Sequence, residues 1–305
     1  MAFPADRVLT LDELRALQKR SNRPGAMRLA IHLALLIGAG VLVSLSSGAW
    51  TVPSMFLLGL VQVALFAPAH ETMHQTAFAS RRINTVVGWL TACPSLLNWH
   101  FYTAYHLAHH RHTQIPGLDP ELAGPVTAPA TLRQYLLRVL GVPFWRLRLI
   151  ALWDCLRGDL RAYPYITDKT APVIIRSGRA MALLMIGGAI MAALFFGWTT
   201  PLLFWIGPQL LGQPALRAYL LAEHTGCTLD GNGLTNTRTT YTWAPVRLLM
   251  WDMPYHAEHH LFPSIPFHRL ADTHAVLKHR LGAIQQGYVR WNLDFIRTLR
   301  AGVGT

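Results

Sequence analysis

Four long apolar stretches constrain the fold of this chain more than any other feature. They lie at residues 29–46, 50–69, 180–196 and 202–221, and the fourth is the least uniformly apolar. A helix needs about 20 residues to cross a hydrocarbon core of about 30 Å. Backbone N–H and C=O groups inside a bilayer must form hydrogen bonds with one another, and a helix satisfies this requirement. We therefore predict an all-α fold with four transmembrane helices.

The distribution of charge predicts how these helices are arranged. The turns at 47–48 and 197–201 contain no charged residue, whereas charged residues fill the segments before, between and after the two pairs of stretches. Two hairpins with all polar segments on one side satisfy this pattern. The net charge is +12, with 24 Arg and 3 Lys, and an excess of basic residues marks the cytoplasmic side. We expect a multi-pass protein, of a bacterial inner membrane, with its polar part facing the cytoplasm.

The domain organisation follows from this layout. We expect a cytoplasmic amphipathic segment at 1–28 and a single membrane domain at 29–305, whose helical, histidine-rich cap comprises 70–179 and 222–305. Apolar but interrupted stretches at 83–97 and 135–156 are typical of helices that lie in the membrane interface. The basic residues are scattered rather than interleaved with aromatics, which disfavours binding to nucleic acid.

Three histidine clusters and one separate histidine are the main candidates for chemistry. The clusters are an HxxxH motif at 70–74 and HxxHH motifs at 106–110 and 256–260. Histidines three or four residues apart share a helix face and can bind one metal, while adjacent histidines point apart and can serve two metals. Each cluster lies at the cytoplasmic end of a stretch or in a cytoplasmic segment. The nine candidate metal ligands are His70, His74, His106, His109, His110, His224, His256, His259 and His260.

Polar residues near these histidines are candidates for supporting roles. Glu71, Glu223 and Glu258 are carboxylates that can orient the second nitrogen of a ligating ring, and His112 has an orienting or substrate-side role.

A further set of polar residues lies inside the apolar stretches. Gln209, Gln213 and Arg217 are spaced by four residues before His224, and Gln62 precedes His70 by eight. Polar groups inside a membrane face other helices or a cavity. They therefore either form hydrogen bonds between helices or line a substrate channel.

The boxes HETMH, HLAHH and HAEHH resemble those of the membrane fatty acid desaturase and hydroxylase superfamily. The resemblance covers roughly residues 50–275 and extends to the motifs at 110–113, 119–121, 236–240 and 253–255. It implies two Fe ions held mainly by histidines, O2 as co-substrate and removal of hydrogen from an acyl chain. It also points to Asp119 and Asn236 as residues that support the ligands. Some acyl desaturases carry an Asn four residues before the separate histidine, where this chain has Leu220.

Several functions are compatible with these features. The leading hypothesis is an O2-dependent desaturase of a fatty acyl chain or acyl lipid, and its nearest alternative is a hydroxylase or ketolase that acts on a carotenoid or smaller lipophilic molecule. A non-catalytic metal-binding membrane protein and a zinc hydrolase with Glu71 as general base are further alternatives. No dinucleotide, flavin or haem motif is present, so oxidation requires an external electron donor. A ferredoxin-like protein or a cytochrome with its reductase would suit the arginine-rich face, although the positive-inside rule alone also explains these arginines.

Overall fold

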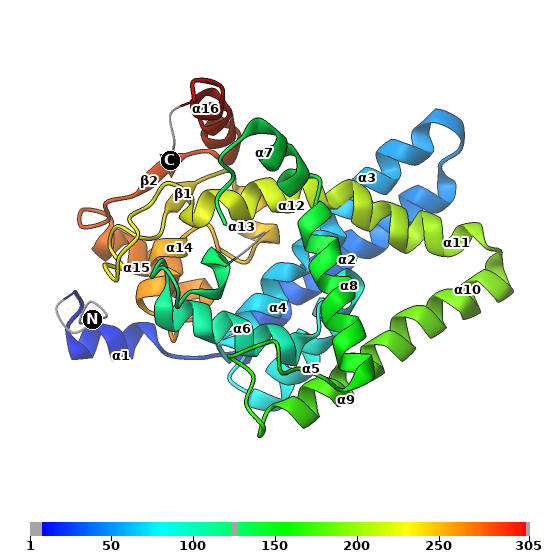
Figure 1. Cartoon of the computed structure of the whole chain (residues 1–305), viewed down its shortest axis with the longest axis horizontal. Helices are drawn as coiled ribbons and strands as arrows, with labels where there is room; N and C mark the ends of the chain where they lie inside the picture. The colour runs from blue at the N-terminus through cyan, green and yellow to red at the C-terminus, as the bar shows by residue number, and fades with distance from the viewer. Residues whose placement is uncertain (1–7, 124–126, 303–305) are drawn as a thin grey trace.

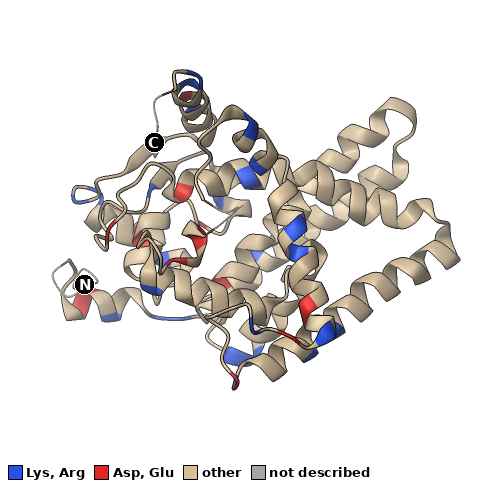
Figure 2. Ribbon diagram, in the orientation of Figure 1, with Lys and Arg blue, Asp and Glu red and all other residues tan. Residues whose placement is uncertain are grey.

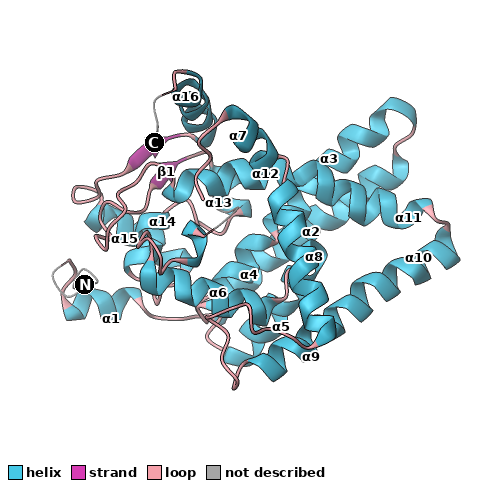
Figure 3. Cartoon of the chain, viewed as in Figure 1, coloured by secondary structure: helices cyan, strands magenta, loops and turns pink. Residues whose placement is uncertain are grey.

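The computed structural model describes residues 8–123 and 127–302. Residues 1–7 of the predicted segment 1–28 and residues 124–126 and 303–305 of the predicted cap lie outside the described residues. The described chain is mostly helical, with one two-stranded sheet (Figure 3). The elements are α1 Leu11–Leu17, α2 Asn22–Leu45, α3 Thr51–Ala64, α4 Phe66–Met73, α5 Arg81–Ala92, α6 Trp99–His112, α7 Leu132–Val139, α8 Val142–Arg157, α9 Ala171–Ala182, α10 Gly188–Phe196, α11 Thr199–Pro201, α12 Gly207–His224, β1 Thr239–Tyr241, α13 Ala244–Leu249, α14 His256–Leu261, α15 Leu270–Leu277, β2 Ile284–Gln286 and α16 Tyr288–Arg300.

Three helical segments are long and apolar enough to cross a membrane. Within the described residues they are Asn22–Leu45, Gly48–Met73 and Ala171–Phe196, which contain the second and third predicted stretches and all but the last residue of the first. The fourth stretch is also helical, because α11, a π-helical segment at Leu202–Ile206 and α12 follow one another without a break. Because it carries polar side chains, this segment is less apolar than the other three.

The apolar helices form two hairpins that project from the same end of the molecule (Figure 1). One hairpin joins α2 to α3 and the other joins α10 to α11. Lysine, arginine and the acidic residues lie elsewhere on the ribbon (Figure 2). The predicted segregation of charge away from the hairpin turns is therefore present in the fold.

Helices α3 and α12 approach closely where both carry glycine. A Cβ atom at Gly59 would overlap the carbonyl oxygen of Pro208, and a Cβ atom at Gly212 would overlap the carbonyl oxygen of Gly59. Small residues let two backbones come into contact in this way. Because α3 runs into α4, and α12 ends at His224, this contact fixes two histidine-bearing segments relative to each other.

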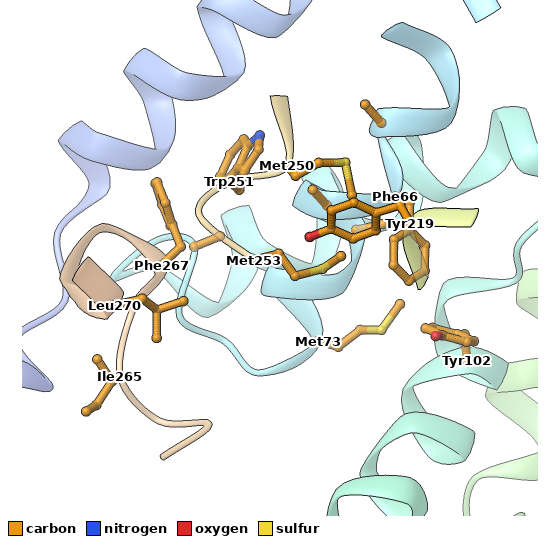
Figure 4. Close-up of a cluster of buried hydrophobic side chains, with 14 of the residues drawn as sticks. Phe66, Met73, Tyr102, Tyr219, Met250, Trp251, Met253, Ile265, Phe267 and Leu270 are labelled. Carbon is orange, nitrogen blue, oxygen red and sulfur yellow. The ribbon is translucent and has the colours of Figure 1, made fainter. Parts of the chain in front are cut away.

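Buried side chains from all the histidine-bearing parts of the chain share one core (Figure 4). Met73 comes from α4, Tyr102 from α6 and Tyr219 from α12, while Trp251 and Met253 precede α14. Apolar burial contributes about 25 cal/mol per Å². The core therefore holds together segments that are far apart in the sequence.

A small parallel sheet completes the cap and was not predicted. β1 pairs with β2, with Thr239 opposite Ile284 and Tyr241 opposite Gln286. With three residues in each strand, it adds little regular structure and leaves the fold essentially all-α.

Candidate metal centre

The structure brings all nine candidate histidines to one place from four helices. α4 carries His70 and ends at His74, and α12 ends with His224. α6 and α14 supply the remaining six histidines, three from each HxxHH motif. The predicted convergence of the four sets is thus found in the fold.

The histidines form two adjacent groups. The first group has five rings, and the second contains three whose ligand atoms lie within 4.8 Å of one another. Neighbouring histidines on one helix go to different groups, so His109 and His110 separate, as do His259 and His260. The first group is His70, His74, His106, His110 and His259, and the second is His109, His224 and His260.

His256 lies beside the second group. Its Nε2 atom is 3.1 Å from Nε2 of His260, and its ring centroid is 5.1 Å from that of His224. The Oε2 atom of Glu223 is 3.5 Å from the same Nε2 atom of His256. The second group therefore has four histidines with a carboxylate at its edge.

The spacing of the ring nitrogens suits metal ligands. Nε2 of His106 lies 2.9 Å from Nε2 of His74 and 3.0 Å from Nε2 of His110. Two nitrogens bound at about 2.1 Å to one metal, at right angles, are about 3 Å apart. The Nε2 atoms of His70, His224 and His259 are buried and have no hydrogen-bond partner within 8–123 and 127–302. Buried polar atoms normally have partners, so these nitrogens fit a bound metal ion.

Burial keeps most of these rings in the form that binds metal. It lowers the pKa of His106, His110 and His259 well below the ordinary histidine value, and the neighbouring rings lower the pKa further. These rings are therefore neutral at neutral pH. His109 differs: burial lowers its pKa, but the negative charges of Glu121 and Asp119 outweigh burial and raise it overall.

Three rings of the second group are held through their other nitrogen. Nδ1 of His109 donates to the Asp119 carboxylate at 2.9 and 3.0 Å, and Nδ1 of His224 donates to the Asn236 carbonyl at 3.3 Å. The Thr113 hydroxyl donates to the His109 carbonyl and accepts from Nδ1 of His260 at 3.1 Å. Such bonds fix the tautomer and leave Nε2 for a metal. Thr113 was not among the residues singled out from the sequence.

The glutamates within the first and third boxes point to other partners. Glu71 accepts from the backbone N–H of Phe267 at 2.9 Å. Glu258 accepts from Thr239 and His274. Through these bonds, neither glutamate contacts a candidate ligand ring. Each glutamate instead links its histidine box to the C-terminal part of the cap. For Glu71, this arrangement disfavours the role of a hydrolytic base.

Two arginines hold the turn that leads into the third box. Trp251 and Asp252 both have positive φ angles, 49° and 54°, which side chains other than glycine rarely adopt. The carboxylate of Asp252 accepts from Arg28 at 2.9 Å and from Arg247 at 2.7 Å. Arg28 comes from α2, so this ion pair ties α14 to the first apolar helix.

A cavity of about 840 Å³ opens beside the histidines. Five of the candidate ligands line it, as do His112, Asp119 and Glu223. Glu121, from the motif at 119–121, lines it too, and so do Arg138 and Arg148, which the sequence did not indicate because their segments carry no motif. Glu121 lies 3.9 Å from Nε2 of His109.

The polar residues of the apolar stretches have two different positions. Gln62, Gln209 and Gln213 are buried between α3 and α12, where Gln209 donates to Gln62 at 3.3 Å and Gln213 donates to Gln209 at 3.5 Å. They are absent from the lining of the cavity, whereas Arg217 is part of it. The three glutamines thus favour the interhelical alternative, and Arg217 favours the substrate-facing one.

Comparisons with known proteins find desaturases among the relatives of this chain. The chain is 25% identical over 281 residues to a sphingolipid delta(4)-desaturase of Drosophila melanogaster, covering 89% of this chain and 79% of the relative. It is 27% identical over 271 residues to the dihydrorhizobitoxine desaturase of Bradyrhizobium elkanii (84% and 75%). It is 22% identical over 280 residues to an sn-1 oleoyl-lipid 12-desaturase of a Picosynechococcus strain (84% and 77%).

A family model described as fatty acid desaturase matches residues 46–292, which include the apolar helices from α3 onward and all nine histidines. The relatives are oxidoreductases by their names, and both histidine groups of this chain could hold a metal ion. The chain belongs to the fatty acid desaturase family.

Proposed function

We propose that this protein is an O2-dependent desaturase whose nine histidines hold two iron ions beside the substrate cavity. The observation that carries the proposal is the division of the histidines into two adjacent groups, with His109 and His110, and His259 and His260, distributed between them. One zinc ion needs about four ligands, so a single hydrolytic zinc leaves half of these rings unused. The names of the relatives support desaturation as the reaction.

Two bound iron ions would supply the oxidising power to remove hydrogen from an unactivated C–H bond. The protein's own residues would position the substrate and exclude water from the cavity. His70, His106 and His256 face the cavity, so a substrate carbon held there lies next to both histidine groups. Tyr102 and Phe66 line the same wall and exclude water from it.

We further propose that the two hairpins span the membrane and that the histidine-bearing cap lies on the cytoplasmic side of a bacterial inner membrane. The absence of charge from the hairpin turns and the excess of arginine in the cap support this orientation. A lipophilic or acyl substrate would then enter from the membrane.

Desaturation with O2 also requires two electrons from outside the protein. We propose that they come from a ferredoxin-like or cytochrome donor that docks on the cap. Arg111 supports this proposal, because it is exposed and directly follows the second box. Changing Arg111 to Glu should slow reduction by an acidic donor and weaken its dependence on salt. An unchanged rate and salt dependence would count against docking at this site.

Metal content and product analysis test the main proposal together. Purified wild-type protein should contain about two iron ions per chain, and the His259→Ala variant should contain less, because the first group loses one of its five rings. His279→Ala is the matched control, since His279 is exposed and belongs to neither group. Cells that express the wild type, but not His259→Ala, should accumulate an unsaturated product.

The same experiment separates the alternatives. An alcohol in place of an alkene from a deuterated acyl substrate would identify a hydroxylase. Tightly held zinc without oxygen consumption would identify a metal-binding protein and overturn the proposal.

A further inference from the structure

Four arginines line the cavity beside the candidate metal centre: Arg111, which is exposed, and three half-buried arginines from different helices. Arg138 comes from α7, Arg148 from α8 and Arg217 from α12, and all three are half-buried. Arg217 lies within electrostatic reach of both of the others. Because guanidinium groups stay charged and repel one another, a cluster of three in a partly buried cavity is unfavourable unless something negative balances it.

Aromatic rings hold two of these guanidinium groups in place. The guanidinium of Arg217 lies over the ring of Phe144 at 4.2 Å, and that of Arg148 lies over the same ring at 5.1 Å and over Tyr102 at 5.3 Å. Stacking of this kind leaves the N–H edges of a guanidinium free to donate. The Nε atoms of Arg148 and Arg217 are buried and lack a hydrogen-bond partner in the described part of the chain.

The acidic residues of the cavity lie against histidines, and two of them also act electrostatically on the arginines, Glu121 on Arg138 and Glu223 on Arg217. Glu121 lies 3.9 Å from Nε2 of His109, Glu223 lies 3.5 Å from Nε2 of His256, and Asp119 accepts from His109. No ion pair joins Arg148 or Arg217 to a carboxylate within residues 8–123 and 127–302. Arg148 and Arg217 therefore line the cavity without a carboxylate in ion-pair contact in the described part of the chain.

The arginines lie close to the histidines along α12. Arg217 and His224 are seven residues apart, which places them on the same face of the helix with an axial separation on the order of 10 Å. A group bound at the arginines and a carbon held at the histidines therefore fit within one small molecule.

We propose that Arg138, Arg148 and Arg217 form an anion-binding site that takes the carboxylate of a small organic acid, and that this acid is the substrate class of the enzyme. The inference rests on the proposed function, since it uses the histidine groups as the place of oxidation. Planar carboxylates match the guanidinium fork, and Phe66, Phe101, Phe144 and Leu147 supply apolar surface for the rest of the molecule. The carboxylate fixes which carbon of the acid faces the histidines.

Binding of hexanoate to the purified full-length protein tests the proposal without requiring turnover. Wild-type protein should bind radiolabelled hexanoate, and its neutral methyl ester should compete poorly. Arg148→Gln and Arg217→Gln should each weaken hexanoate binding about tenfold or more, because each removes a charged hydrogen-bonding partner. Arg146→Gln is the matched control, since Arg146 is an exposed arginine of the same helix and does not line the cavity.

Three further arms complete the design. Arg148→Lys keeps the charge and should retain intermediate affinity, which guards against a glutamine variant that fails to fold. The iron content of Arg148→Gln and Arg217→Gln should equal that of the wild type while their hexanoate binding falls, so that failure of the metal proposal is distinguishable from failure of this one. Nanodiscs that contain phosphatidate should not displace hexanoate. Equal binding of the ester, unchanged binding in both glutamine variants, or displacement by phosphatidate would each overturn the proposal of a small-acid site.

Discussion

At the scale of single residues, the candidate metal centre depends on which nitrogen of each ring is held. Asp119 accepts from Nδ1 of His109 and from the backbone N–H groups of Gln114 and Glu121, at 2.8 to 3.0 Å. One buried carboxylate thus fixes both a candidate ligand and the loop that follows the second box. Asn236 and Thr113 hold His224 and His260 in a similar way. The arrangement of the candidate ligands therefore depends on residues outside the nine histidines.

Changing Asp119 to Asn tests this dependence. The amide cannot accept from His109 as strongly as the carboxylate does, so the ring is less well fixed. We expect metal affinity at the second group to fall about 10- to 100-fold. Competition with a chelator, followed by metal analysis, measures the change. Asp272→Asn serves as control, because Asp272 is exposed and pairs only with Arg269; equal affinities in the two variants would show that Asp119 does not support the centre.

Whether a site residue could be predicted from the sequence depends on whether its position is set locally or by the packing of distant segments. The nine histidines were predictable because spacing along a helix is a local property. Glu71 and Glu258 were expected beside ligand rings, but they bond to Phe267, Thr239 and His274, whose positions depend on how the cap packs. Arg138 and Arg148 were missed because only the meeting of α7, α8 and α12 gives them a common cavity.

At the scale of elements, close backbone contacts position the helices that carry the histidines. The glycine contact between α3 and α12 aligns α4 with the end of α12. The ion pairs of Asp252 with Arg28 and Arg247 anchor α14 to α2. The sequence predicted most of these helices from their apolar pattern. The pairing of β1 with β2 could not be predicted from the sequence, because three residues are too few to show the alternation of polar and apolar residues that is typical of a strand.

Replacing Gly59 by Ala should destabilise the protein. The added Cβ atom overlaps the Pro208 carbonyl oxygen, so α3 and α12 must separate. We expect a loss of about 1–3 kcal/mol in the free energy of unfolding. Thermal unfolding in detergent measures it, and Gly38→Ala is the control because a Cβ atom there meets nothing within 4 Å. Equal stability of the two variants would exclude a tight α3–α12 contact.

Replacing Asp252 by Ala should loosen the third box. The change leaves two arginines without their carboxylate and removes the tie between α2 and α14, at an expected cost of about 3 kcal/mol. Denaturation monitored by circular dichroism gives the stability, and metal analysis shows whether His256 and His260 remain in place. Asp12→Ala removes an exposed ion pair with Arg15 and should cost less than about 1 kcal/mol.

At the scale of the whole molecule, the fold separates an uncharged end from a charged, histidine-bearing end. The hairpin turns lie at one end and the cap at the other (Figures 1 and 2). The cavity opens beside the histidines, within the cap and not at the hairpin tips. This division was predictable from hydropathy and charge alone, because each is a property of long segments. The shape and lining of the cavity were not, since they depend on contacts between segments distant in sequence.

Labelling of single cysteines tests the proposed orientation. In a background without the three native cysteines, Ser47→Cys and Thr199→Cys should react with a membrane-impermeant maleimide added to intact cells. Asp272→Cys should react only after the membrane is permeabilised. Both turn positions are exposed on the uncharged hairpins, and Asp272 is exposed on the cap. Labelling of Asp272→Cys in intact cells would reverse the proposed topology.

The recruitment of candidate ligands from four separate helices also bears on the lifetime of the protein in the cell. On the proposed function, iron ions held by the histidines of α4, α6, α12 and α14 would cross-link parts of the chain between residues 70 and 260, and a ligand that binds only the native state stabilises it by mass action. Without iron, the cap would then unfold more often and be cleaved more readily by proteases. The amount of enzyme should therefore follow the iron supply even at constant synthesis, and pulse-chase measurements with and without a chelator would reveal the shortened half-life.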